Sequence, residues 1–165
     1  KFPQYFPYKA RFFYPFTTRL ALSKAKLVAT TSGQIKEELI EFGRIKPEKI
    51  AVLYPSLNES LFKPLKKGSL KLPKNYLLTI STLEPRKNLI AGIKAFEKLL
   101  KERSLPADFQ YLIVGKQGWY YQDLLQQVKT LGLAEQVRFL GYVPDEELET
   151  IFKHAQAFLY LSNYE

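Results

Sequence analysis

Short apolar segments alternate with amphipathic segments along the second half of the chain. The apolar segments, which we expect to be strands, cover residues 76–81, 111–115, 137–141 and 157–161. The amphipathic segments repeat their apolar residues with the period of a helix, and they cover residues 88–103, 119–132 and 144–155. Strands that alternate with helices of this length form parallel βαβ units with right-handed crossovers. The pattern therefore predicts an α/β fold, a Rossmann-like parallel sheet with helices on both faces.

The first half of the chain carries a shorter version of this pattern. A helical segment leads into a predicted strand at residues 26–30, and Ser32 is suited to cap the helix that follows. That helix carries an apolar stripe and is expected to end near Gly43. Residues 49–54 form a further apolar segment, which we expect to be a buried strand.

The periodic pattern lapses between residues 55 and 75. This segment holds three prolines, one glycine and scattered lysines, a composition typical of a linker. We therefore place a domain boundary there. Residues 1–54 are expected to belong to one domain, residues 55–75 to an interdomain linker and residues 76–165 to a second domain.

Composition excludes several classes of protein. Hydrophobic residues make up 46% and charged residues 25% of the chain, as in a globular protein. No apolar run approaches the roughly 20 residues that cross a bilayer. The chain has no cysteine and one histidine, so neither a metal centre nor thiolate chemistry is expected. It begins with Lys1 and ends directly after an apolar segment, so we expect a piece of a longer protein.

Positive charge is concentrated at the start of the chain. The net charge is +9, and the first 26 residues contain six basic side chains, eight aromatic ones and no acidic one. Such a mixture is typical of a surface that faces anionic lipid, so peripheral contact with a membrane is one interpretation. The other is that these aromatic side chains belong to a core whose remainder lies outside this sequence. No nucleic-acid-binding motif accompanies the charge, so nucleic acid is not an expected partner.

Candidate chemistry lies at the carboxyl ends of the predicted strands, because ligands bind there in a parallel sheet. The residues that follow the four strands are Ser81, Thr82, Arg86 and Lys87, then Gly115, Lys116 and Gly118, then Gly141, Tyr142 and Val143, and finally Ser162, Asn163, Tyr164 and Glu165. These four turns are expected to line one rim of the sheet.

Arg86 and Lys87 conflict with a local rule, because they precede a helix whose predicted N-cap is Asn88. The partial positive charge of a helix N-terminus repels a cation, at a cost of about a few tenths of a kcal/mol. A bound phosphate or diphosphate would reverse the sign, since backbone N–H groups and both side chains would face negative charge. The alternative is that both residues are solvated loop cations balanced by Glu84.

A resemblance to a known family is carried by four segments, YLLTISTLEPRKNLIAGIKAF, YLIVGKQGWYYQDL, VRFLGYVPDEELETIF and AFLYLSNYE. In order and spacing they resemble the nucleotide-sugar-binding domain of the retaining group 1 glycosyltransferases, which have the GT-B architecture. The residues before them resemble that family's passage out of the acceptor domain. The resemblance implies a cytoplasmic transferase that moves a hexose such as mannose. Peripheral contact with the inner membrane surface is expected from the basic opening of the chain and not from the resemblance. The donor would be a GDP- or UDP-linked sugar, the acceptor a saccharide or a lipid-linked molecule, and no cofactor is implied.

The resemblance also implies roles for three charged residues. Arg86 and Lys87 match the basic pair that holds the donor diphosphate, where fixed cations stabilise the charge that develops as the glycosidic bond breaks. Glu165 matches the first acid of a Glu-x7-Glu motif that contacts the donor sugar, and its partner would fall eight positions later. We therefore expect these three residues to be catalytic.

Further residues are implied to bind the donor: Ser81, Thr82, Gly115, Lys116, Tyr142, Val143 and Ser162. Tyr142 and Val143 match the turn that lies against the nucleotide base. Ser81 and Thr82 depart from the pattern, because the family often has glycine at the first position and some relatives have a basic residue at the second. These departures place more weight on the two cations that follow.

Two other functions stay open at this point. One is a non-catalytic Rossmann-like module that binds a nucleotide, and the other is a basic protein that binds polyanions or a membrane surface through its first 26 residues. The glycine-rich loop and the catalytic histidine of the family's amino-terminal domain are not in this sequence. We therefore expect the fragment alone to be inactive.

Overall fold

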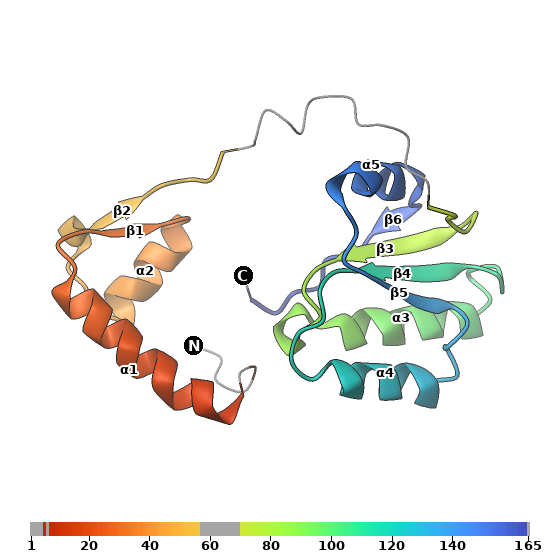
Figure 1. Cartoon of the computed structure of the whole chain (residues 1–165), viewed down its shortest axis with the longest axis horizontal. Helices are drawn as coiled ribbons and strands as arrows, with labels where there is room; N and C mark the ends of the chain where they lie inside the picture. Colours follow the sequence, from red (N-terminus) through yellow and green to blue (C-terminus); the bar gives the residue numbers. More distant parts are fainter. Residues whose placement is uncertain (1–4, 6, 57–69, 165) are drawn as a thin grey trace. The chain divides into compact units, whose positions relative to one another are not determined.

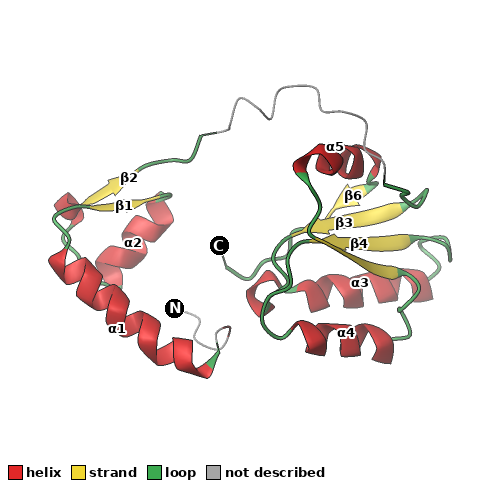
Figure 2. Ribbon diagram, viewed as in Figure 1, coloured by secondary structure: helices red, strands yellow, loops and turns green. Residues whose placement is uncertain are grey.

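A computed structural model describes residue 5, residues 7–56 and residues 70–164. The chain divides into two compact units, Lys1–Pro64 and Leu65–Glu165 (Figures 1 and 2). The domain limits placed at residues 54 and 76 stay predictions. Within the described residues, no helix combines the length and the apolar character needed to pass through a bilayer.

The first unit contains a two-stranded parallel sheet and two α-helices. Its elements are α1 (Tyr8–Lys24), β1 (Val28–Thr30), α2 (Gly33–Glu41), the 3-10 helix η2 (Pro47–Lys49) and β2 (Ile50–Val52). β1 and β2 pair in parallel, with Val28 opposite Ile50. The predicted cap of α2 is confirmed, because the Ser32 hydroxyl accepts a hydrogen bond from the Ile35 amide at 3.3 Å.

The strand predicted at residues 49–54 is wrong in its extent. The parallel ladder stops because β1 ends at Thr30, whose carbonyl accepts a last hydrogen bond from the Leu53 amide at 2.7 Å. Beyond that bond the side chains of Leu53 and Tyr54 are exposed. The length of β2 therefore follows from its short partner strand and not from its own apolar run.

The second unit is built on a four-stranded parallel sheet. Its elements are β3 (Tyr76–Ile80), the 3-10 helix η4 (Pro85–Lys87), α3 (Leu89–Lys101), β4 (Gln110–Val114), α4 (Tyr121–Thr130), β5 (Val137–Gly141), α5 (Asp145–His154) and β6 (Ala157–Phe158). The strand order is β5-β4-β3-β6. The chain moves outward from β3 to β5 and then returns to the other side of β3, so a topological switch point lies between β3 and β6.

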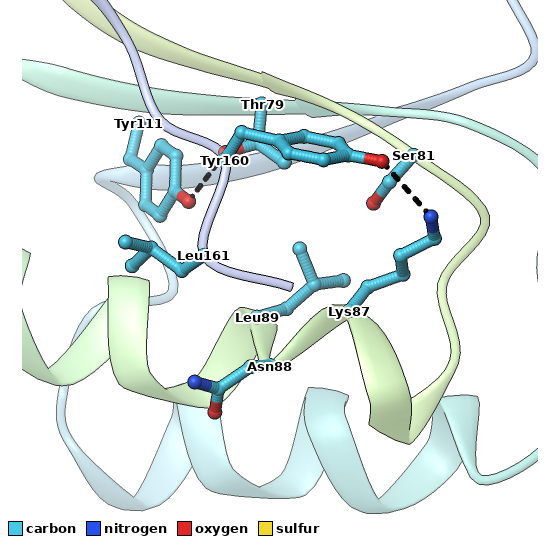
Figure 3. A pocket seen from close by; sticks show the side chains of 8 residues that line it. All are labelled: Thr79, Ser81, Lys87, Asn88, Leu89, Tyr111, Tyr160 and Leu161. Atoms are coloured by element: carbon cyan, nitrogen blue, oxygen red, sulfur yellow. Dashed lines mark hydrogen bonds between the residues drawn. The ribbon is translucent and has the colours of Figure 1, made fainter. Parts of the chain in front are cut away.

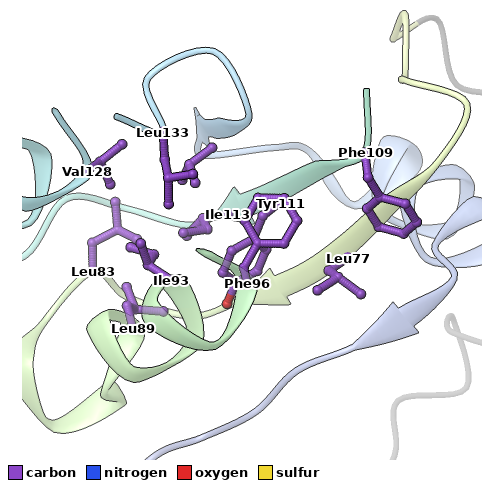
Figure 4. Close-up of a cluster of buried hydrophobic side chains, with 11 residues drawn as sticks. Leu77, Leu83, Leu89, Ile93, Phe96, Phe109, Tyr111, Ile113, Val128 and Leu133 are labelled. Carbon is purple, nitrogen blue, oxygen red and sulfur yellow. The ribbon is translucent and has the colours of Figure 1, made fainter. Parts of the chain in front are cut away.

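Alternate residues of the strands supply two apolar cores, one on each face of the sheet. Leu77, Tyr111 and Ile113 pack with α3 and α4 in the larger core (Figure 4). Tyr76 and Leu78 point to the other face, where α5 covers them (Figure 1). Because the side chains of a strand alternate between its faces, the short apolar runs serve both cores. The predicted parallel sheet with helices on both faces is confirmed.

β6 is shorter than the predicted strand 157–161. It pairs with β3 over two residues, and the Leu159 amide adds one further bond to the Leu78 carbonyl at 2.7 Å. The carbonyl of Leu159 does not continue the ladder but accepts a hydrogen bond from the Thr79 hydroxyl at 2.8 Å. The chain then leaves the sheet and runs toward η4, where the Asn163 amide donates to the Arg86 carbonyl at 2.8 Å.

The start of α3 also differs from its prediction. Asn88 adopts a left-handed conformation with φ of 54° and ψ of 35°, and its side chain makes no capping hydrogen bond. Its backbone makes the turn instead, since its amide bonds to the Pro85 carbonyl and its carbonyl accepts from the Ala91 amide. Asparagine tolerates this conformation better than most residues. Asn88 therefore precedes α3 as predicted, but its backbone conformation and not a capping side chain suits it to that position.

Candidate active site at the switch point

A small pocket lies at the carboxyl end of the sheet, where β3 and β6 diverge (Figure 3). Its lining residues come from β3, η4, α3, β4 and the segment after β6, and they are Thr79, Ser81, Lys87, Asn88, Leu89, Tyr111, Tyr160 and Leu161. The enclosed volume is about 10 Å³, which is enough for one water molecule. A larger ligand would therefore lie at the mouth of this pocket.

Lys87 is the positively charged side chain that lines the pocket. It ends η4, and the residue is only 8% exposed. Its ammonium group donates a hydrogen bond to the Tyr160 hydroxyl at 3.0 Å and lies 5.3 Å from the centroid of that ring. A lysine is rarely buried to this degree without a functional or structural partner. The sequence-based prediction that Lys87 faces the strand ends agrees with this position.

Ser81 supplies an unsatisfied polar atom. Its hydroxyl oxygen is buried and has no hydrogen-bond partner among the described residues. Figure 3 shows this hydroxyl beside the Lys87 ammonium and the Tyr160 hydroxyl. A buried polar atom without a partner costs about 1–3 kcal/mol, so such atoms usually mark a bound water or ligand. Ser81 and Lys87 together therefore form a polar end of the pocket.

A hydrogen-bonded pair closes the opposite wall. The hydroxyls of Thr79 and Tyr111 are 2.7 Å apart. Because the one hydroxyl hydrogen of Thr79 goes to the Leu159 carbonyl, Tyr111 donates in this pair. Burial raises the pKa of Tyr111 above its ordinary value, and the hydrogen bond with Thr79 opposes that rise. This wall ties β3, β4 and the residue after β6 together.

Arg86 does not line the pocket. Its Nε lies 2.5 Å from a carboxylate oxygen of Glu84, which is buried. Its Nη1 donates to the Tyr164 carbonyl at 3.1 Å. Lys87 thus faces the pocket, while the Arg86 guanidinium contacts Glu84 and the segment after β6. That the two cations together hold the donor diphosphate stays a prediction.

The predicted base-binding turn, Tyr142 and Val143, follows β5, and the loop expected near it, Gly115 and Lys116, follows β4. The Lys116 ammonium is 5.3 Å from the centroid of the Tyr142 ring, which is 65% exposed. The Val143 side chain is buried in the core under α5. Gly115 has φ of 146°, and it packs against the backbone of Ser81.

The other predicted donor-binding residues have separate surroundings. Thr82 is exposed. The Ser162 hydroxyl is within hydrogen-bond distance of two carbonyls, those of Arg86 at 3.2 Å and Tyr164 at 2.9 Å. Glu165 lies outside the described residues, so its role stays a prediction. Among the residues that the structure describes, no three His, Cys, Asp or Glu side chains come together as metal ligands.

Sequence reasoning missed three residues of this region, Thr79, Tyr160 and Glu84. Tyr160 was assigned to the interior of a strand, and only the early end of β6 brings its hydroxyl to Lys87. Thr79 is a polar residue in an otherwise apolar strand, a signal that the sequence does contain. The sequence suggests only a counter-ion in a solvated loop at Glu84, whereas the residue is buried, with 7% of its surface exposed.

Comparison with known proteins gives the chain a family. The sequence model described as "Glycosyl transferases group 1" matches residues 63–165. The O-antigen chain mannosyltransferase B of Escherichia coli is 33% identical over 154 residues, which are 88% of this chain and 39% of that protein. The O-antigen chain mannosyltransferase RfbU of Salmonella typhimurium is 28% identical and covers 97% of this chain and 43% of that protein. The chain thus spans about 40% of the length of these relatives.

Solved structures agree on the fold. HepE of Anabaena, in complex with UDP and glucose, superposes with a TM-score of 0.69 and 23% identity, over 97% of this chain and 43% of that one. Sucrose-phosphate synthase of Thermosynechococcus elongatus superposes with a TM-score of 0.70 and 18% identity, over 95% of this chain and 39% of that one. These neighbours have the GT-B fold, which confirms the predicted fold class. With the family match covering more than half of its residues, the chain belongs to the group 1 glycosyl transferases.

Proposed function

We propose that this chain is part of a retaining glycosyltransferase that moves a hexose from a nucleoside-diphosphate sugar to a saccharide or a lipid-linked acceptor. The observation that carries the proposal is the pairing of a buried lysine, Lys87, with an unsatisfied hydroxyl, Ser81, at the switch point of a parallel sheet. Ligands bind at this point in folds of this class. Family membership supports the transfer chemistry, and the two O-antigen chain mannosyltransferases described above support mannose as the sugar.

The donor diphosphate would lie at the mouth of the pocket. There it would meet the Lys87 ammonium, the Ser81 hydroxyl and the first backbone N–H groups of α3, which have no partner within the helix. As the bond from the sugar to the diphosphate breaks, negative charge grows on the leaving group. A cation held beforehand at that place stabilises the transition state more than the ground state. Lys87 would thus supply electrostatic catalysis.

The nucleotide base would lie toward the ends of β4 and β5. Tyr142 offers an exposed aromatic face, and Lys116 is held beside it by a cation–π contact. HepE is solved with UDP, and the mannosyltransferase relatives leave a GDP-linked donor equally open. Titration of the full-length protein with GDP and UDP decides between them, because the affinities of a base-reading site differ between purine and pyrimidine.

The decisive test of the diphosphate site is Lys87→Met in the full-length protein. Loss of a charge-assisted hydrogen bond costs about 1.5–3 kcal/mol, so the affinity for nucleoside diphosphate should fall about 10- to 150-fold. The affinity for the free nucleoside should stay the same. Calorimetry measures both, and Lys94→Met, at an exposed lysine of α3, is the matched control. Equal losses for the two ligands, or no loss, would contradict the proposal.

A non-catalytic nucleotide-binding module is the alternative. It predicts the same diphosphate binding but no transfer of sugar from any donor that binds. The sequence after Glu165 separates the two functions before any assay, because a second glutamate eight positions later completes the acidic motif of the transferases. Its absence would favour the module.

We also propose that the first unit contacts an anionic membrane on its cytoplasmic side. α1 has no buried residue, and Tyr8, Phe12, Phe13 and Phe16 are each at least 64% exposed. Basic side chains of the same helix accompany them, and their charge would attract an anionic lipid surface. Vesicles of neutral lipid with and without phosphatidylglycerol test this by co-sedimentation of the full-length protein. Binding that needs the anionic lipid and weakens with salt supports it, and equal binding to both vesicles refutes it.

A further inference from the structure

Five residues on two separate segments form a polar cluster beside the pocket, which we call the clamp. They are Glu84, Arg86, Ser162, Asn163 and Tyr164. The first two belong to the turn that contains η4, and the other three to the segment after β6. None of them lines the pocket.

Hydrogen bonds from both the side chain and the backbone of Arg86 hold the two segments together. The guanidinium donates to the Tyr164 carbonyl at 3.1 Å, while the Arg86 carbonyl accepts from the Asn163 amide at 2.8 Å. The Ser162 hydroxyl lies 3.2 Å from the Arg86 carbonyl. One residue of η4 thus makes three contacts with three successive residues that are almost 80 positions away in the chain.

Glu84 fixes the direction of the guanidinium. Its carboxylate lies 2.5 Å from Nε of Arg86, and the residue is 7% exposed. A buried ion pair of this kind adds little net stability, because desolvation of the charges offsets their attraction. A planar guanidinium held through Nε has its remaining N–H groups aimed in set directions. The Glu84–Arg86 ion pair therefore mainly sets the orientation of the guanidinium and adds little to the stability of the fold.

The clamp sets the spacing across the pocket mouth. Lys87 follows Arg86 directly, and Tyr160 precedes Ser162 by two residues. The Lys87–Tyr160 hydrogen bond of 3.0 Å joins the same two segments at the pocket. A shift of the segment after β6 relative to η4 would therefore move the Lys87 ammonium relative to the Tyr160 hydroxyl.

We propose that Arg86 is a positioning residue, which holds the segment after β6 against η4 and does not itself bind the donor diphosphate. The proposal rests on the proposed function and refines it, since the sequence alone assigned Arg86 and Lys87 the same role. Lys87 remains the group that meets the diphosphate. Arg86, with its orientation fixed by Glu84, holds residues 162–164 against η4.

The test is a charge-balanced exchange, Glu84→Gln with Arg86→Met, in the full-length protein. It removes the ion pair and the guanidinium–Tyr164 hydrogen bond of the clamp, leaves the two contacts of the residue 86 carbonyl in place, and does not change the net charge near the diphosphate. The affinity for nucleoside diphosphate should stay within about twofold, while kcat for sugar transfer should fall roughly 10- to 100-fold because catalytic groups are displaced. A guanidinium that binds the diphosphate directly predicts the reverse, a large loss of nucleoside diphosphate affinity. That result would overturn the proposal.

A second variant, Arg86→Lys, keeps the charge but cannot reproduce the two directed contacts with Glu84 and Tyr164. The proposal expects kcat to fall as far as in the double variant. Recovery of nearly full activity by lysine would show that charge alone matters and would overturn it. If the double variant fails to fold, Arg86→Lys and Ser162→Ala, which removes the hydroxyl beside two carbonyls, carry the same test.

The matched control exchanges another ion pair of the same unit, Glu97→Gln with Lys101→Met. This pair lies on α3 at 2.6 Å, and its loss should leave both nucleoside diphosphate affinity and kcat unchanged. Exchange of the Asn163 amide hydrogen, whose acceptor is the Arg86 carbonyl, should become faster in the Arg86 variants only. The proposed function fails separately, if the unaltered protein binds no nucleoside diphosphate or if Lys87→Met has no effect.

Discussion

Gly115→Ala is expected to destabilise the second unit through a backbone collision next to the pocket. Gly115 follows β4 with φ of 146°, a conformation that residues with a side chain rarely adopt. A Cβ atom built there would lie 1.8 Å from the Ser81 carbonyl oxygen and 2.7 Å from its carbonyl carbon. The obstacle is backbone, so it cannot move aside by a change of rotamer. The turn after β3 would have to shift.

A second glycine, Gly132, separates the loss of stability from backbone strain from the loss caused by the collision with Ser81. Gly132 also has a positive φ, 71°, but a Cβ atom there would meet nothing within 4 Å. Gly132→Ala should therefore lower the free energy of unfolding by about 1–2 kcal/mol, because alanine is strained in the left-handed conformation. Gly115→Ala should lower the free energy of unfolding by at least that amount and by about 1–3 kcal/mol more, because the new Cβ atom collides with the Ser81 backbone. The difference between the two variants measures the close approach to Ser81.

Urea unfolding followed by tryptophan fluorescence provides the assay. Trp119 is the one tryptophan of the chain and lies in the second unit, so its signal reports that unit. A displaced Ser81 should also weaken nucleoside diphosphate binding in Gly115→Ala but not in Gly132→Ala. If the two variants lose the same free energy of unfolding, the backbone contact is not a constraint and the reasoning is refuted.

Three further predictions concern other hydrogen bonds and the buried tyrosines. Tyr111→Phe removes the hydroxyl that bonds to Thr79, and the free energy of unfolding should fall by about 0.5–1.5 kcal/mol in the same urea assay. Burial raises the pKa of Tyr76 and Tyr111 above 10.0, so unfolded chains lose these protons first. The free energy of unfolding should therefore be unaffected by these groups below about pH 10 and should fall above it, less steeply in Tyr111→Phe. Ser32→Ala removes the cap of α2 and should cost about 1 kcal/mol, measured by circular dichroism during heating of the first unit.

The order of elements in the second unit could be predicted because each is encoded locally. The alternation of a strand and the 3.6-residue period of a helix both appear within windows of five to fifteen residues, as in β4 and α3. The ends of the strands could not be predicted in the same way. β6 ends early because Thr79, 80 residues away, takes the carbonyl that would have continued the ladder.

Part of the site could be predicted because the strand boundaries are encoded locally. Residues after a parallel strand share one rim, so Ser81 and Lys87 could be placed near each other from the strand boundaries alone. The different surroundings of Arg86 depend on a carbonyl of Tyr164, 78 positions away, and on the burial of Glu84. No local period or composition contains that information. The sequence alone therefore could not assign different surroundings to these two adjacent cations.

Hydrogen bonds hold two sides of this pocket, which is also lined by the apolar side chains of Leu89 and Leu161. Apolar contacts are non-directional and tolerate small displacements, whereas a hydrogen bond weakens steeply when its geometry changes. The Tyr111–Thr79–Leu159 chain holds one wall, and the Arg86–Tyr164 contact holds the segment that forms the other. Each bond adds only about 1 kcal/mol to stability. Their effect should consequently appear first in the rate of transfer, which depends on displacements far smaller than those that unfold a domain.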